Sequence, residues 1–102
     1  MTDYFTYFVY ILASAPRGTL YIGITNNILR RMWEHQNETD PTSFTTKYNV
    51  KHLVYVEQHN NVMTAILREK RLKKWRRTWK FQLITQSNPH WHDLSTKWQH
   101  VA

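Results

Sequence analysis

Two short runs of aromatic and β-branched residues near the start of the chain constrain its fold more than any other feature. The runs are residues 7–12 (Tyr-Phe-Val-Tyr-Ile-Leu) and residues 20–25 (Leu-Tyr-Ile-Gly-Ile-Thr), and both have the length and composition of β-strands. Between them, Pro16 and Gly18 interrupt regular structure and favour a turn. The pattern predicts strands at about 5–12 and 19–25, joined by a turn over Ala13–Gly18.

Each predicted strand has an apolar face and a face that carries tyrosine, because side chains alternate along a strand. Tyr10 and Tyr21 fall on the same face, next to Gly23. A glycine inside a strand often marks a place where a ligand or another backbone comes close. The three residues therefore form either a site for a phosphate chain, with Gly23 against nucleic acid, or an ordinary aromatic pair between strands. The apolar face consists of Val9, Ile11, Leu20, Ile22 and Ile24.

The rest of the chain is predicted to hold three helices and one further strand. The expected elements are a helix from Asn26 or Asn27 to about His35, a polar loop at 36–49, a strand at 53–57, and helices at 62–75 and about 78–85. Asparagine is a typical helix cap, as at Asn61, and Asn88-Pro89 ends the last helix. The order β-β-α-β-α-α predicts an α+β fold, a small three-stranded mixed or antiparallel sheet covered by helices, in a single domain over residues 1–102.

The positive charge of the chain is concentrated in one segment. The net charge is +7 and the sequence pI is about 9.9, which favours a polyanionic partner such as nucleic acid. Residues 68–80 hold eight of the fourteen Lys and Arg against one acid, Glu69. A basic helix face can follow a phosphate backbone, although many such faces are merely solvated. The residues predicted to contact nucleic acid there are Lys70, Lys73, Lys74 and Arg77.

The composition also excludes several classes of protein and site. The chain has no Cys, which excludes disulfides and thiolate metal sites. It has no apolar run of membrane-spanning length, and Met1-Thr2-Asp3-Tyr4 lacks the character of a signal peptide. We therefore expect a cytoplasmic protein that does not associate with membranes.

Glu69 is the most unusual residue of the helix predicted at 62–75. It falls on the same helical stripe as Ile66 and Leu72, which should face the core. A carboxylate that faces inward is costly unless it is paired or binds a metal. A single carboxylate suits Mg²⁺, which often takes one or two protein carboxylates together with water and phosphate oxygens. The alternative is an internal ion pair with one of the arginines.

Arg31 and His35 share one face of the first predicted helix, because they are four residues apart. An arginine can stabilise negative charge that develops on a phosphate, and a histidine can move a proton. The alternative is a solvated pair without a catalytic role.

The order of these residues resembles the GIY-YIG endonuclease family, from about Tyr7 to Leu94. The likeness is to its small stand-alone bacterial members and, within the same family, to the catalytic domain of the incision subunit of nucleotide excision repair. Tyr21-Ile22-Gly23 matches the second tripeptide of the family name, and Phe8-Val9-Tyr10 is similar to the first. Phe8 departs from the pattern, since it replaces the first Gly. The further matches are Arg31, His35, Glu69 and Asn88.

The resemblance implies hydrolysis of a phosphodiester with one divalent ion, Mg²⁺ or Mn²⁺, held by Glu69. Tyr10 or Tyr21 would orient and deprotonate the attacking water, and Arg31 would stabilise the transition state. A neighbouring cation must lower the phenol pKa, which is ordinarily about 10, or His35 must relay the proton. Asn88 would position metal-bound water or phosphate.

We therefore expect a metal-dependent DNA endonuclease. Single-stranded or branched DNA is the favoured substrate, since tryptophans offer stacking surfaces at Trp33, Trp75 and Trp79, and RNA is a further candidate. Lys47 and Tyr48 are the next candidates for strand contact, unless they belong to a solvated loop. The alternative function is a weakly cleaving nucleic-acid-binding module that acts with a DNA-repair partner, which the small size of the chain favours.

Overall fold

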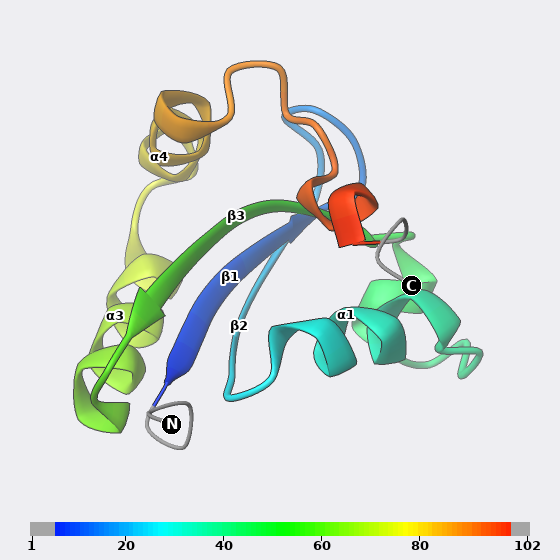
Figure 1. Ribbon diagram of the computed structural model, residues 1–102. Coiled ribbons are helices and arrows are strands. Elements are labelled where there is room, and N and C mark those ends of the chain that lie inside the picture. Colours follow the sequence, from blue (N-terminus) through cyan, green and yellow to red (C-terminus); the bar gives the residue numbers. More distant parts are fainter. Residues whose placement is uncertain (1–5, 99–102) are drawn as a thin grey trace.

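The computed structural model describes residues 6–98 and is built around an antiparallel sheet of three strands in the order β2-β1-β3 (Figure 1). The strands are β1 (Tyr7–Ala13), β2 (Leu20–Thr25) and β3 (His52–His59). The predicted hairpin is confirmed, and its register places Tyr10 opposite Gly23 and Leu12 opposite Tyr21. Strand β3 is longer than predicted because it pairs with the whole of β1. Phe5, the first residue of the predicted strand, lies outside the described residues.

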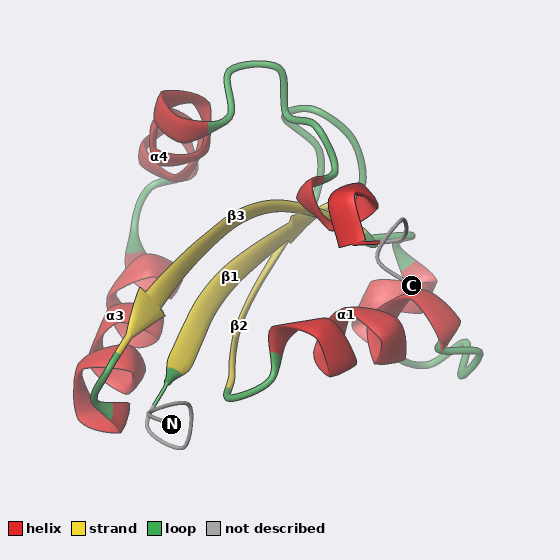
Figure 2. Cartoon of the chain, in the orientation of Figure 1, coloured by secondary structure: helices red, strands yellow, loops and turns green. Residues whose placement is uncertain are grey.

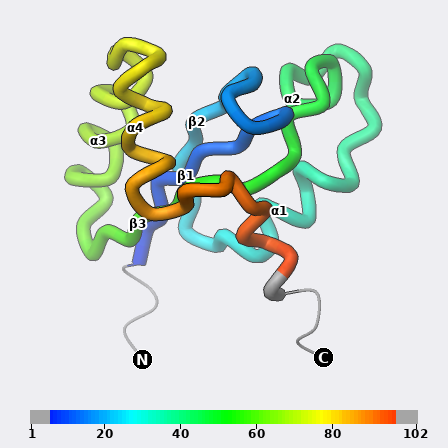
Figure 3. The backbone as a smooth tube through the Cα atoms, turned by 90° about the horizontal axis from the view of Figure 1, so that it is seen from above, coloured from blue at the N-terminus to red at the C-terminus, as the bar shows by residue number. Residues whose placement is uncertain are grey.

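Helices cover both faces of this sheet, as Figure 2 shows by element type. They are α1 (Ile28–Asn37), α2 (Phe44–Lys47), α3 (Val62–Lys74), α4 (Arg77–Ser87) and the 3₁₀ helix η2 (Leu94–Trp98). Seen from above in Figure 3, α3 and α4 lie on one side of the sheet, and α1 and α2 on the other. The α+β class and the order β-β-α-β-α-α are therefore confirmed. Within residues 6–98, no helix is long and apolar enough to cross a lipid bilayer.

The alternation of the strands divides the buried side chains into two clusters. On the side of α3 and α4, the apolar face predicted from the sequence packs against Ala65, Leu72 and Ile84. On the other side, Tyr10 and Leu12 pack with Ile28 and Met32 of α1. The tyrosine face is therefore not a bare surface, because α1 covers part of it.

Asparagine caps begin two of the helices, as predicted. The side chain of Asn27 accepts a hydrogen bond from the Arg30 amide, and that of Asn61 from the Met63 amide, at 3.1 and 2.7 Å. The segment 36–49 was predicted as a loop throughout, but it contains α2, capped by Ser43. A helix of four residues is too short to show a helical period in the sequence.

Candidate active site

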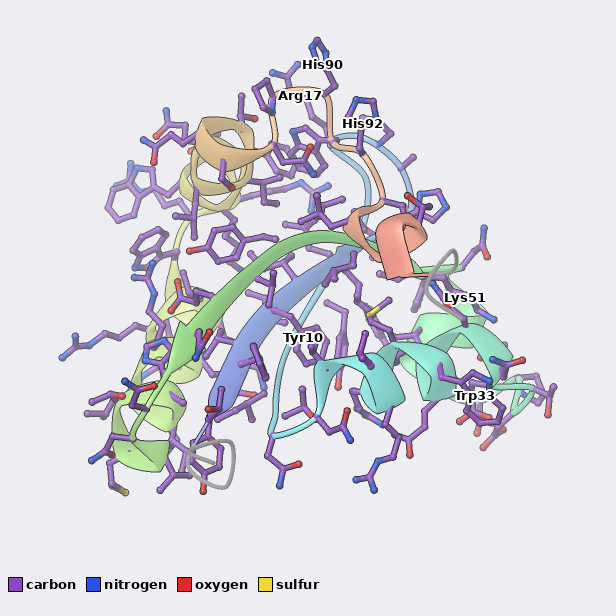
Figure 4. The ribbon with its side chains drawn as sticks, viewed as in Figure 1. Tyr10, Arg17, Trp33, Lys51, His90 and His92 are labelled. Atoms are coloured by element: carbon purple, nitrogen blue, oxygen red, sulfur yellow. The ribbon has the colours of Figure 1, made fainter. Side chains whose placement is uncertain are left out.

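Tyr10, His35 and Arg31 form a hydrogen-bonded chain between β1 and α1. The Tyr10 hydroxyl lies 3.0 Å from His35 Nε2, and Arg31 Nε donates to the same hydroxyl at 3.3 Å. Because the hydroxyl accepts from Arg31, we assign its proton to the bond toward His35 Nε2, which then accepts. Figure 4 shows Tyr10 on the side of the sheet that α1 covers. The three predicted residues are thus brought together by packing α1 onto the hairpin.

Burial sets the protonation of this chain. It raises the pKa of Tyr10 to about 12, and the hydrogen bond from Arg31 only partly opposes it. Burial, and then the charge of Arg31, lower the pKa of His35 to about 4. At neutral pH Tyr10 is therefore a phenol and His35 a neutral imidazole.

Arg31 keeps its charge in this setting. Burial acts to lower the pKa of its guanidinium, but hydrogen bonds to Tyr10 and Glu34 outweigh this effect, and the pKa is raised above its ordinary value. The bond to Glu34 Oε1 is 3.1 Å long. Arg31 is therefore a fixed positive charge at the mouth of the site.

Tyr21 occupies a more open position than Tyr10. Its ring centroid lies 6.3 Å from that of Tyr10 and 5.3 Å from that of His35. Its side chain is only partly buried, and it lines a groove of about 280 Å³ together with Arg31 and His35. Of the two tyrosines, Tyr21 is the one that a ligand in this groove can reach.

Gly23 lies directly against the side chain of Tyr10. A Cβ atom built at this position would lie 2.5 Å from the Tyr10 hydroxyl and 2.6 Å from Cζ of its ring. The space above Gly23 is thus taken by the phenol of Tyr10, and Gly23 is buried. The glycine is therefore needed so that Tyr10 can lie across β2, and the expected contact between Gly23 and nucleic acid stays a prediction.

Glu69 faces inward from α3, as predicted, and its side chain is 16% exposed. Its negative charge contributes, after burial and Tyr21, to the raised pKa of Tyr10, which links it to the tyrosine face. Its ion-pair partner is a lysine rather than one of the arginines: Lys73 Nζ lies 3.2 Å from Glu69 Oε2. Lys73 is on the next turn and is more than half exposed, so this pair is weak and easily opened.

The donor chemistry around Glu69 is compatible with a hard divalent cation. A carboxylate with one mobile partner leaves oxygen lone pairs for a metal ion whose other ligands are water and phosphate oxygens. Within residues 6–98 there is no group of three or more His, Cys, Asp or Glu arranged to hold an ion. A metal ion at Glu69 therefore depends on the substrate for part of its coordination.

Asn88 does not join the tyrosines. Its side chain is 4% exposed, its amide nitrogen donates to the carbonyls of Val54 and His92 at 3.1 and 2.9 Å, and its amide oxygen accepts from the His92 amide. These bonds connect the end of α4 to β3 and to the segment that follows. The amide of Asn88 thus holds the backbone, and the catalytic role expected for it stays a prediction.

The basic residues fall into two groups. The side chains of Lys70, Lys73 and Lys74 are exposed on α3, as predicted for contact with a phosphate backbone. Arg77 instead donates to the carbonyls of Arg17 and Gly18 and stacks on Phe81, with Cζ 4.6 Å from the ring centroid. The guanidinium thus connects the β1–β2 turn to α4, and the expected role of Arg77 in binding nucleic acid stays a prediction.

The structure adds Phe44 to the candidate residues. Its ring lies 6.1 Å from Tyr21 and 4.9 Å from Tyr48, so the three aromatics form a row that starts at the groove. Lys47 Nζ lies 5.5 Å from the ring centroid of Tyr48. An aromatic residue within the polar segment 36–49 was the one signal that sequence analysis could have used. Trp33, by contrast, lies on the outer side of α1, away from Tyr10 (Figure 4).

Comparison with known proteins gives matches that cover most of the chain. Residues 6–82 match the family model described as the GIY-YIG catalytic domain. The UPF0213 protein DP2720 of Desulfotalea psychrophila is 38% identical over 86 residues, which cover 84% of this chain and 77% of that protein. A UPF0213 protein of Syntrophus aciditrophicus is 35% identical over 80 residues, which cover 78% of this chain and 91% of that protein. No solved structure matches this chain.

Proposed function

We propose that this chain, which belongs to the GIY-YIG family of catalytic domains, is an endonuclease that hydrolyses phosphodiester bonds in DNA. One observation carries the proposal most directly. Tyr21 and the fixed charge of Arg31 line one groove, and Lys73, the ion-pair partner of Glu69, lines another groove together with Tyr21. A phenol, a guanidinium and a carboxylate are the groups that hydrolysis of a phosphodiester needs.

Tyr21 is the better candidate for contact with the attacking water. Tyr10 is 1% exposed, its hydroxyl is already bonded to His35 and Arg31, and its pKa is raised by burial to about 12. Tyr10 is therefore a poor proton acceptor and serves to hold Arg31 and His35 in place. Tyr21 is partly exposed in the groove, where it can orient a water molecule. It can take the proton of that water only as a phenolate, once its hydroxyl has released its own proton to solvent beside the charge of Arg31.

Arg31 and His35 have distinct roles in this scheme. The guanidinium of Arg31 neutralises charge that builds up on the phosphate oxygens as the bond to water forms. His35 remains neutral and accepts from Tyr10, so it fixes the orientation of that ring rather than supplying a second positive charge. A proton relay through His35 requires the Tyr10 hydroxyl to lose its proton first.

A divalent ion, Mg²⁺ or Mn²⁺, would be held by Glu69 and would supply Lewis-acid stabilisation of the leaving oxygen. The protein provides one carboxylate and keeps Lys73 beside it. Lys73 and Lys80 also line a groove of about 360 Å³ with Tyr21 and Phe44. These lysines are positioned to bind phosphates next to the one that is cleaved.

Single-stranded or branched DNA is the proposed substrate form, with RNA as the competing one. The row Tyr21, Phe44 and Tyr48 offers flat surfaces on which unpaired bases can stack. Bases in a uniform duplex are already stacked and are not available for such contacts. Lys47, at the end of the row, can pair with the backbone.

The test is a cleavage panel of single-stranded, duplex, nicked and forked DNA, and RNA, with Mg²⁺, Mn²⁺ or chelator. We expect cleavage that requires metal and is lost in Glu69→Gln, with unpaired DNA cleaved fastest. If the wild-type protein binds these strands but leaves all of them intact, the proposed endonuclease activity is refuted.

The second candidate function is the nucleic-acid-binding module that cleaves weakly and acts with a DNA-repair partner. The pair between Glu69 and Lys73 favours it, since the lysine competes with a metal ion for the carboxylate. This function predicts binding of strands that is unaffected by Glu69→Gln and no metal-dependent product.

A further inference from the structure

A second groove lies between the end of α3 and α4, apart from the tyrosine face. It has a volume of about 280 Å³ and is lined by Trp75, Trp79, Gln82, Leu83 and Gln86. Figures 1 and 3 show α3 and α4 on the opposite side of the sheet from α1, which carries Arg31 and His35. The groove therefore shares no lining residue with the groove that contains Tyr21, Arg31 and His35.

Two tryptophans give this groove flat aromatic walls. The rings of Trp75 and Trp79 meet edge to face, with their centroids 6.1 Å apart. Trp79 is 47% exposed, although tryptophan is largely buried on average in folded proteins. An exposed indole beside a partly buried one offers a surface on which a planar group can stack.

Guanidinium groups lie over both indoles. Arg68 Cζ is 5.2 Å from the ring centroid of Trp75, and Arg76 Cζ is 5.4 Å from that of Trp79. Arg68 is also bonded to Glu57, so much of its charge is balanced. Within the described residues the guanidinium of Arg76 makes no hydrogen bond or ion pair. Arg76 thus places an unbalanced positive charge beside the exposed indole, as expected for a site that takes a planar group next to a phosphate.

The amides of Gln82 and Gln86 supply polar groups on the same side of α4. The two residues are four apart, so their side chains lie one above the other along the helix. Neither carboxamide makes a hydrogen bond to another residue of the part of the chain that the structure describes. A glutamine amide has both a donor and an acceptor, and it can pair with two adjacent atoms on the edge of adenine.

We propose that this groove binds one unpaired base of a nucleic-acid strand, with a preference for adenine. The base stacks on Trp79. The side-chain amide of Gln82 or Gln86 forms hydrogen bonds with the edge of the base, and Arg76 binds the phosphate beside it. The ligand is chosen by chemistry: planar aromatic walls, free amides and a free cation fit a nucleotide, while an apolar protein surface would use neither the amides nor the charge.

Helix α4 connects this site to the tyrosine face. Its Lys80 lines the groove that contains Tyr21, while its Trp79 lines the second groove. A strand that leaves the proposed active site along Lys73 and Lys80 therefore meets the base-binding groove on the next part of α4. The inference rests on the proposed nucleic-acid partner, but it does not depend on cleavage.

The test is binding of labelled oligonucleotides, measured by fluorescence anisotropy in chelator at fixed salt so that no strand is cut. The strands are oligo-dA, oligo-dT and an abasic strand of equal length, which has the same phosphates and no bases. We expect Trp79→Ala to weaken binding of oligo-dA about tenfold, as is typical for loss of one base–aromatic stack, and to leave the abasic strand unchanged. Leu67→Ala, which removes an equally exposed apolar side chain from α3, should alter neither.

Two further variants keep the test decisive if Trp79→Ala proves unstable. Trp79→Phe retains a ring and should recover most of the affinity for oligo-dA. The double variant Gln82→Leu/Gln86→Leu should reduce the preference for oligo-dA over oligo-dT, whereas Gln58→Leu, at an exposed position of β3, should not.

The proposal is overturned if Trp79→Ala weakens binding of the abasic strand as much as that of oligo-dA. It is also overturned if sedimentation shows a dimer of the wild type that Trp79→Ala dissolves, since a second copy would then occupy the groove. Failure of the proposed nuclease looks different: strands that bind with the expected base dependence but are not cut leave this inference intact. If strands are cut normally and Trp79→Ala does not affect their binding, the proposed base-binding role of the groove is refuted and the proposed nuclease function stands.

Discussion

Two glutamates at the interface of the sheet and α3 are equally shielded from solvent and yet have opposite surroundings. The side chains of Glu57 and Glu69 are 19% and 16% exposed. Glu57, on β3, accepts from Arg68 Nε at 3.0 and 3.2 Å, from the Tyr55 hydroxyl, and bonds to His59 Nε2 at 2.6 Å. Glu69, on α3, is paired with Lys73 alone among the described residues.

The difference separates a carboxylate with a structural role from the one that we propose to hold a metal ion. Burial acts to raise the pKa of Glu57, but its hydrogen bonds outweigh this, and the pKa lies below its ordinary value. Its lone pairs are used, so the group ties β3 to α3. Glu69 has lone pairs that face only one mobile ammonium. Burial of a carboxylate is thus no guide to function by itself, and the number of unused acceptor sites is the better guide.

The largest expected effect comes from exchanging the two glutamates for glutamine. Glu69→Gln should reduce cleavage roughly a thousandfold, or about 4 kcal/mol, because it removes the carboxylate that we propose to hold the metal ion. Glu57→Gln should leave the cleavage rate of the folded protein nearly unchanged. It should lower the free energy of unfolding by about 1–3 kcal/mol, since Arg68 loses its charged acceptor.

Initial cleavage rates and urea unfolding curves of the two variants measure both effects. The comparison breaks if Glu57→Gln loses activity at a concentration of denaturant where it is fully folded, or if Glu69→Gln retains the wild-type rate.

The second effect is a difference in acid sensitivity between the two regions. His35 has a folded pKa of about 4, lowered by burial and Arg31, while an unfolded histidine has a pKa near 6.5. Between these values the unfolded state binds more protons, so the free energy of unfolding falls as pH falls, by about 3 kcal/mol in total. The pKa of Glu57 is also lowered, so Glu57 loses stability in the same sense as the pH falls, but only below its ordinary value of 4.5.

Urea unfolding at intervals from pH 7 to 4 measures this slope. His35→Gln should remove most of the decline above pH 4.5, and Glu57→Gln should leave it in place. An equal decline in wild type and His35→Gln would show that the imidazole is not held neutral by the fold.

The third effect divides the two tyrosines. Tyr21→Phe should slow cleavage about a hundredfold, the typical contribution of a general base, without loss of stability. Tyr10→Phe should cost about 1–3 kcal/mol of stability, because Arg31 and His35 lose a buried partner, and should slow cleavage less. Cleavage rates measured with saturating substrate rank the two variants by activity, and unfolding curves rank them by stability. Slower cleavage by Tyr10→Phe than by Tyr21→Phe would mean that Tyr10, and not Tyr21, contacts the attacking water.

The smallest effect concerns Lys73, the ion-pair partner of Glu69. Lys73→Met should lower the Mg²⁺ concentration needed for half-maximal cleavage about two- to fivefold, since an exposed ion pair contributes little. Lys70→Met removes the same charge from α3 without touching the pair and serves as the control. Equal shifts in both variants would mean that net charge, and not the pair with Glu69, sets the affinity for metal.

Much of the fold follows from local sequence. The hairpin is specified by the alternation of residues 7–12 and 20–25, and two helix starts by Asn27 and Asn61. The short helix α2 and the length of β3 were not predictable in the same way. Four residues show no helical period, and a strand is extended by the partner with which it pairs.

The candidate site was predictable in its members and less so in their roles. The spacing of Arg31 and His35 indicates a shared helix face, but not that both meet Tyr10. Nothing in the sequence distinguishes Asn88 as a holder of backbone, or Arg77 as a tie to the Gly18 carbonyl, from residues that bind a ligand. These assignments depend on distances between segments far apart in the chain.

The sequence by itself determined the α+β fold, the tyrosine face, the inward position of Glu69 and the concentration of positive charge, because each follows from local periodicity or composition. Only the tertiary structure decided which tyrosine is buried, why position 23 must be glycine, and which glutamate keeps unused lone pairs. Those properties arise from the packing of α1 and α3 on the sheet. Packing controls desolvation and hydrogen-bond supply, and no local pattern of residues encodes either one.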